Sequence, residues 1–143
     1  MRLKKWLLFC LSFLLACATA GAPVLTLAVD SSSMGYKRHI EIRDRAYTVT
    51  TIAVGPDGRP ATKSRDAKLS KETYQELLSI LDRAKLADLK PTYTDKALVT
   101  AKLNTTLLDL TYKGQKKAVF ILGLTIPAEL APLLDLITPL MHT

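Results

Sequence analysis

Hydrophobic and polar residues alternate with a period of two along several short segments, which is typical of strands with one buried face. In residues 36–43, Ile40 and Ile42 share one side of the segment, and Glu41 and Arg43 share the other. Four more segments are rich in apolar and β-branched side chains and predict further strands. They are residues 24–29, 47–54, 105–112 and 116–122.

Two other segments repeat apolar residues every three or four positions, which is the spacing of an amphipathic helix. The first follows Ser70, a good N-cap, and carries Glu72 in its first turn. Its apolar stripe consists of Tyr74, Leu77, Leu78, Leu81 and Ala84. The second spans residues 127–141, in which Pro132 predicts a kink or a later start and Pro139 an early end.

Turn residues between the strands favour antiparallel neighbours, with turns expected at Asp44-Arg45, at residues 55–58 and at Lys113-Gly114. The polar, basic segment 59–68 predicts an exposed loop, and residues 91–99 a connection. We therefore expect a two-layer α+β domain over residues 24–143, following an N-terminal signal helix. Its antiparallel sheet would have about five strands, with two helices packed on one face.

The N-terminal segment has the pattern of an export signal. Three cations, Arg2, Lys4 and Lys5, precede an uncharged run of 11 residues at 6–16. A membrane span needs about 20 apolar residues, so this run better fits the hydrophobic part of a signal peptide.

Two processing sites compete, and an uncleaved anchor is the third interpretation. Residues 14–17, Leu-Leu-Ala-Cys, resemble a lipobox, which would remove residues 1–16 and lipidate Cys17. Residues 18–20, Ala-Thr-Ala, fit ordinary signal peptidase, which would remove residues 1–20. We favour lipidation, because Cys17 directly follows the apolar run. The expected location is then the periplasm or the outer surface, with the protein anchored to a membrane through Cys17.

The positive charge of the chain bears on which partners it could bind. The chain has 20 Lys and Arg residues against 13 Asp and Glu, but the first 20 residues hold three of the cations and no acid, so the remainder carries a net +4. The candidate partner-binding cations form two clusters, Arg59, Lys63 and Arg65 in one and Lys113, Lys116 and Lys117 in the other. They favour an envelope protein or an anionic surface over nucleic acid, because no aromatic residues interleave with them.

No pattern of residues predicts catalysis or a cofactor. His39 and His142 are the two histidines, and no CxxC or HExxH spacing exists, so we expect no metal site. Ser31 and its serine neighbours lack the GxSxG context of an activated nucleophile. An enzyme would need clustered ionisable groups, for example His39, Glu41 and Asp95 in one cleft. We therefore expect a protein that is not an enzyme and needs no cofactor.

Two stretches carry a resemblance to a known family. One is Leu69-Ser70-Lys71-Glu72 at the start of the first helix, with Tyr93-Thr94-Asp95 after it. The other runs from Lys116-Lys117-Ala118-Val119-Phe120 to Ile126-Pro127 and the apolar residues that follow. The chain resembles a family of small uncharacterised exported bacterial lipoproteins with a ββαββα domain, and more loosely the emfourin-type inhibitors of metalloproteases. The resemblance implies the fold rather than an activity.

Together these observations favour an exported, lipid-anchored module of the cell envelope that binds a partner or has a structural role. The alternative is a protease inhibitor that acts through an exposed loop or a strand edge.

The leader yields the first test. Cys17→Ser should abolish incorporation of radiolabelled or clickable fatty acid into the protein, because the thiol is the acceptor of the lipid. Labelling is read by gel fluorography, with Cys10→Ser as the matched control that keeps its label. Lipid labelling of Cys17→Ser would exclude Cys17 as the acceptor.

Overall fold

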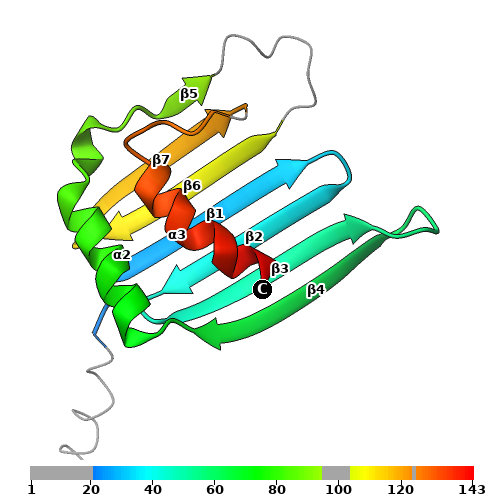
Figure 1. Cartoon of the computed structure of the whole chain (residues 1–143), viewed down its shortest axis with the longest axis horizontal. Helices are drawn as coiled ribbons and strands as arrows, with labels where there is room; N and C mark the ends of the chain where they lie inside the picture. Colours follow the sequence, from blue (N-terminus) through cyan, green and yellow to red (C-terminus); the bar gives the residue numbers. More distant parts are fainter. Residues whose placement is uncertain (1–20, 95–103, 124) are drawn as a thin grey trace, which may run out of the picture.

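One sheet and two helices make up the part of the chain that the computed structural model describes, residues 21–94, 104–123 and 125–143. The elements in chain order are β1 (Leu25–Ser33), β2 (Tyr36–Arg43), β3 (Ala46–Val54), β4 (Pro60–Lys68), α2 (Lys71–Arg83), a 3-10 turn (Leu86–Asp88), β5 (Thr92–Thr94), β6 (Thr105–Tyr112), β7 (Gln115–Leu122) and α3 (Ala131–His142). The seven strands are ordered β4-β3-β2-β1-β6-β7-β5. Both α2 and α3 lie on the same face of the sheet (Figure 1).

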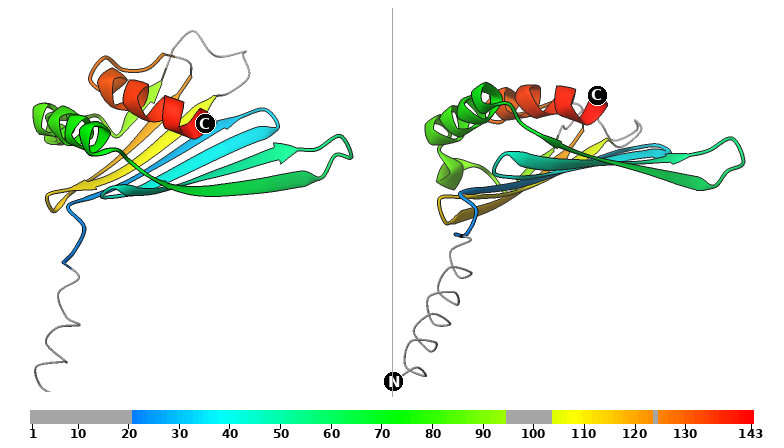
Figure 2. Two further views of the ribbon diagram at one scale, coloured as in Figure 1. Left: turned by 60° about the horizontal axis from the view of Figure 1, so that its bottom comes forward. Right: turned by 90° about the horizontal axis from the view of Figure 1, so that it is seen from below.

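Period-two alternation divides the sheet into an apolar face and a polar face. In β2, Ile40 and Ile42 are fully buried, whereas Glu41 and Arg43 are exposed on the opposite side. The register places Ile42 beside Leu27 of β1, which is also buried. The hydrophobic core is thus a single layer between this face and the helices (Figure 2).

Helix α2 begins where the sequence predicts. The Oγ of Ser70 accepts a hydrogen bond from the backbone N–H of Thr73 at 3.0 Å. The helix buries Leu77, Ile80 and Leu81, whereas Leu78 of the expected stripe is only partly buried. The N-cap and the apolar spacing therefore account for the position of the helix.

Helix α3 takes the later start that Pro132 allows, because Pro132 lies in its first turn. The early end expected at Pro139 is wrong, since the helix continues to His142. A side chain from the sheet holds this last turn, as Arg65 donates from Nη2 to the carbonyl of Leu140 at 3.0 Å. The turn therefore persists although Pro139 removes a backbone donor.

The expected sheet of about five antiparallel strands is wrong in number and in direction. The sheet has seven strands and is mixed, because β5 runs parallel to β7. The segment expected to be a loop is β4, and the expected connection after residue 91 contains β5. The expected signal helix falls in residues 1–20, which lie outside the described residues.

The two extra strands lack the apolar pattern from which strands are predicted. Eight of the nine residues of β4 are exposed, so pairing with β3 through a tight hairpin, rather than burial, makes it a strand. The three-residue β5 pairs with residues 120–122 of β7, and the N–H of Phe120 donates to the carbonyl of Pro91 at 2.9 Å. Backbone pairing of this kind leaves little trace in composition.

Adjacent leucines of β6 test the assignment of the two faces. Leu108 is 0 % exposed in the core, whereas Leu107 is 38 % exposed on the other face. Leu108→Ala should lower the free energy of unfolding by about 2–5 kcal/mol, because it leaves a cavity. Leu107→Ala should cost less than about 1 kcal/mol. Urea titration followed by circular dichroism measures both, and equal losses would show that the faces are misassigned.

Candidate functional site

The polar face of the sheet is not covered by helix in the described structure (Figure 2). Its side chains lie in rows that cross the strands, because residues paired in register point to the same side. One row crosses from Ser64 through Thr50, His39 and Asp30 to Leu107. We call this surface the open face.

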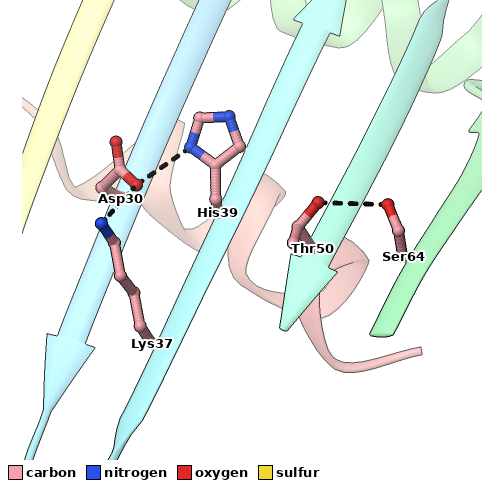
Figure 3. Close-up of polar contacts among 5 residues, drawn as sticks. All are labelled: Asp30, Lys37, His39, Thr50 and Ser64. Atoms are coloured by element: carbon pink, nitrogen blue, oxygen red, sulfur yellow. Dashed lines mark hydrogen bonds and ion pairs between the residues drawn. The ribbon is translucent and has the colours of Figure 1, made fainter. Parts of the chain in front are cut away.

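A network of polar contacts crosses the middle of the open face (Figure 3). The Oδ1 of Asp30 lies 3.0 Å from His39 Nδ1 and 3.8 Å from Lys37 Nζ. The hydroxyls of Thr50 and Ser64 lie 3.1 Å apart. His39 is therefore paired with a carboxylate that the register places opposite it.

These groups are arranged as contacts between neighbouring strands. The hydroxyl of Thr50 is engaged by Ser64 on β4, on the side away from His39. Two open grooves on this side of the sheet, of about 510 and 550 Å³, are lined by the neighbouring rows and share Glu41. Thus His39 and Glu41 lie on one face, while Asp95 lies outside the described residues. The network stabilises the pairing of β1 with β2 and of β3 with β4.

Charges of opposite sign occupy adjacent rows of the open face. Glu41, Asp66 and Asp109 lie in one row, on β2, β4 and β6. The next row carries Arg43, Lys68 and Lys116. This alternation reduces any single-sign field over the face, which argues against this half of the sheet as a strong anion-binding surface.

The hairpin of β3 and β4 extends beyond the helices as an arm (Figure 1). Its tip is a tight loop in which Arg59 N–H donates to Asp57 Oδ1 at 3.1 Å. At Gly55 a Cβ would approach that carboxylate to 2.9 Å, so a side chain there would displace it. Ile52 and Val54 of β3 are 37 % and 57 % exposed on the arm.

Strand β4 is an edge, since no other described strand pairs with its outer side. At one end Gly55 N–H donates to the carbonyl of Arg59 at 2.8 Å, and at the other Leu69 N–H donates to the carbonyl of Arg45 at 2.7 Å. In an antiparallel pair of strands, residue pairs that exchange two backbone hydrogen bonds alternate with pairs that exchange none. The bonds at both ends agree that the odd-numbered residues from Arg59 to Leu69 are the ones that bond to β3. The residues of β4 that direct both N–H and C=O outward are therefore Thr62, Ser64, Asp66 and Lys68.

The first predicted basic cluster lies on this arm, and its three cations differ in whether they form hydrogen bonds. Arg59 is exposed at the tip of the arm, and Lys63 is exposed on the side of β4 that faces the helices. Arg65 is engaged, because its Nη2 donates to the Leu140 carbonyl at 3.0 Å and to Thr143 Oγ1 at 3.2 Å. Arg65 therefore stabilises the C-terminus of α3, where a cation also complements the helix dipole.

The second predicted cluster surrounds the β6–β7 hairpin, at the opposite end of the sheet from the tip of the arm (Figure 1). Lys113 is engaged there, since its Nζ donates to Asp82 of α2 at 2.8 Å. Lys116 is exposed on the open face, and Lys117 is half-buried. The structure thus separates the six predicted cations into two distant groups, and in each group one member fixes a helix to the sheet.

The carboxylate of Asp82 accepts two hydrogen bonds. Besides Lys113, Tyr112 donates from its hydroxyl to the same carboxylate oxygen at 2.7 Å. The hydrogen bond from Lys113, followed by that from Tyr112, lowers the pKa of Asp82 below its ordinary value of 3.8. The same pairing raises the pKa of Lys113.

Metal ligands are not clustered among the described residues, where no three His, Cys, Asp or Glu side chains are placed to hold a metal ion. No described helix has the length and apolar character needed to cross a membrane. Cys17, the expected lipid acceptor, lies outside the described residues. No protein-family model matches the chain, and no curated protein sequence matches it significantly.

The Asp82 contacts predict a pH dependence. Because the pKa is lower in the folded chain, the stabilisation is present above about pH 3.8 and is lost as the pH falls through the folded value. Asp82→Asn should therefore lower the melting temperature at pH 7, and the difference from wild type should shrink only below about pH 3.8.

Thermal melts between pH 2 and pH 7 measure this effect. Asp135→Asn on the exposed side of α3 is the matched control and should follow wild type. A constant difference between Asp82→Asn and wild type at all pH values would contradict the prediction.

Proposed function

We propose that this chain is an exported, lipid-anchored binding protein of the cell envelope, and that it captures an extended, acidic segment of a partner protein along the outer edge of β4. The observation that carries the proposal is the unpaired edge of a nine-residue strand, projecting on an arm beyond the helices. An edge of this kind can accept a further strand through main-chain hydrogen bonds.

The geometry of the edge supports recognition of an extended chain. Thr62 and Ser64 alternate with residues bonded to β3, so outward-facing N–H and C=O groups recur every second residue. Their spacing along the strand is about 6.8 Å, which matches the repeat of an added antiparallel strand.

The charge of the edge supports an acidic partner. Arg59, Lys63 and Lys68 are exposed on or beside β4. The nearest acids are Asp57 and Asp66, which accept hydrogen bonds within the arm itself. Such charges also discourage self-association of edges, so they would select an acidic strand over a second copy of this basic one.

Export and anchoring rest on the leader, in which a basic segment, a short apolar run and Cys17 follow one another. A binding role without catalysis is supported by the open face, where the ionisable groups serve cross-strand contacts. The proposed partner is then a protein of the envelope or at the cell surface.

A protease inhibitor is the second candidate, and the same edge favours it. Proteases bind substrates in an extended conformation, which an exposed strand can imitate. Loss of metalloprotease activity on addition of the full chain would favour inhibition, whereas binding without such loss would favour the first candidate.

A proline in the edge tests the main proposal. Thr62→Pro removes an outward N–H without removing a bond to β3, and proline is tolerated on edge strands. Binding of a peptide of alternating Thr and Glu should weaken about tenfold, since a hydrogen bond is lost and the ring obstructs the edge. Thr62→Val, which keeps the N–H, should bind like wild type.

Fluorescence anisotropy measures both variants, and a peptide of alternating Thr and Lys should not bind. Lys63→Glu should weaken the Thr-Glu peptide and reduce the salt dependence. Equal binding by Thr62→Pro and Thr62→Val would move the site away from the β4 edge. If charge reversal of Lys113, Lys116 and Lys117 alone abolished binding, the hairpin would be the site instead.

A further inference from the structure

A second candidate site lies on the opposite side of the sheet, under the C-terminal half of α3. A groove of about 390 Å³ opens there between α3 and the ends of β1, β2, β6 and β7. Its walls combine the apolar side chains of Val29, Ile121 and Leu134 with hydroxyl groups and one guanidinium. This groove does not involve the β4 edge, so it is independent of the proposed function.

Arg38 is the charged group in the groove, and its position is unusual. It follows the parity of Ile40 and Ile42, so its side chain is on the helix-covered face, where those two are fully buried. The guanidinium lies over the ring of Tyr36, 4.4 Å from the centroid. Arg38 itself is half-buried, so its guanidinium is only partly removed from water.

The hydrogen bonding of Arg38 is incomplete. Its Nη1 lies 2.7 and 2.8 Å from the two ring nitrogens of His142, of which one can accept at a time. Its Nε is buried and has no hydrogen-bond partner. No carboxylate of the described residues forms an ion pair with it. A buried donor of a charged group without a partner calls for a physical explanation.

Neighbouring residues supply further groups that suit an anionic oxygen. The register places Ser31 directly opposite Arg38, and Thr106 directly opposite Ser31. Both line the groove together with Thr138 of α3. Hydroxyls beside a guanidinium are donors that commonly complete the coordination of a carboxylate.

We propose that this groove binds a carboxylate carried on a short apolar body. The guanidinium of Arg38 and the hydroxyls of Ser31 and Thr106 would donate to the carboxylate oxygens, while Val29, Ile121 and Leu134 contact the apolar part. Arg38 is the only Lys or Arg among the described residues that line the groove, which favours a group with a single negative charge. The carboxylate can belong to a free small acid or to the C-terminus of a peptide.

Titration of the full chain with hexanoate tests the free acid, and titration with a tripeptide ending in leucine tests the peptide C-terminus. Hexanamide and the C-terminally amidated tripeptide are the uncharged controls. Chemical shifts of the Ser31, Arg38 and Thr106 amides report binding at the groove. Chemical-shift changes that saturate with a carboxylate and are absent with its amide would support the proposal. The probe that binds more tightly shows whether the carboxylate belongs to a free acid or to a peptide C-terminus.

Two substitutions assign the effect to Arg38. Arg38→Met keeps the aliphatic stem and removes the guanidinium, so binding should weaken about tenfold or more, as expected for loss of a charge-assisted contact. Arg43→Met is the matched control, because Arg43 lies on the same strand but is exposed on the opposite face of the sheet and does not line the groove. It should bind the carboxylate like wild type.

Stability separates this role from a purely structural one. If Arg38 serves a ligand, Arg38→Met should leave the melting temperature unchanged or raise it, since an unpartnered buried donor is removed. The proposal is overturned if neither carboxylate binds at millimolar concentration, or if Arg38→Met binds as wild type does. It is also overturned if Arg38→Met is destabilised while wild type binds neither probe. Thr62→Pro should retain carboxylate binding, so failure at the β4 edge and failure here are distinguishable.

Discussion

Burial of one face of a seven-stranded sheet under two helices is the interaction on which the rest of the structure depends. In the part of the chain that the structure describes, the buried side chains of β1, β2 and β6 have no other apolar layer to pack against. Both described helices cover that face, and period-two alternation makes the opposite face polar. The same arrangement leaves the β3–β4 hairpin projecting past the helices, with its outer edge unpaired.

Two cations hold the helices on the sheet rather than facing a partner. Lys113 pairs with Asp82 of α2, and Arg65 contacts the last turn of α3. The net positive charge therefore overstates the surface available for an anion, and the exposed cations of the arm, Arg59 and Lys63, remain the best candidates for a partner.

The two proposed sites would bind their partners through different kinds of interaction. The β4 edge offers backbone groups in water, where a single hydrogen bond contributes little and affinity requires several in register. The Arg38 groove offers one partly desolvated cation, for which a single matched carboxylate has a large effect. The first favours a long, extended partner, and the second a small group that buries an apolar body.

Local pattern in the sequence determined the strands with apolar alternation, helix α2 with its Ser70 cap, and the turns at Asp44 and Lys113, because these depend on neighbours within one or two turns of chain. Tertiary structure alone decided that residues 60–68 form an edge strand and that β5 joins the sheet, since both depend on backbone pairing with distant segments. It also decided which cations are engaged. The parity of β2 placed Arg38 on the side of Ile40, but its orphaned Nε and the groove beside it exist only because α3, about a hundred residues later in the chain, closes over that end of the sheet.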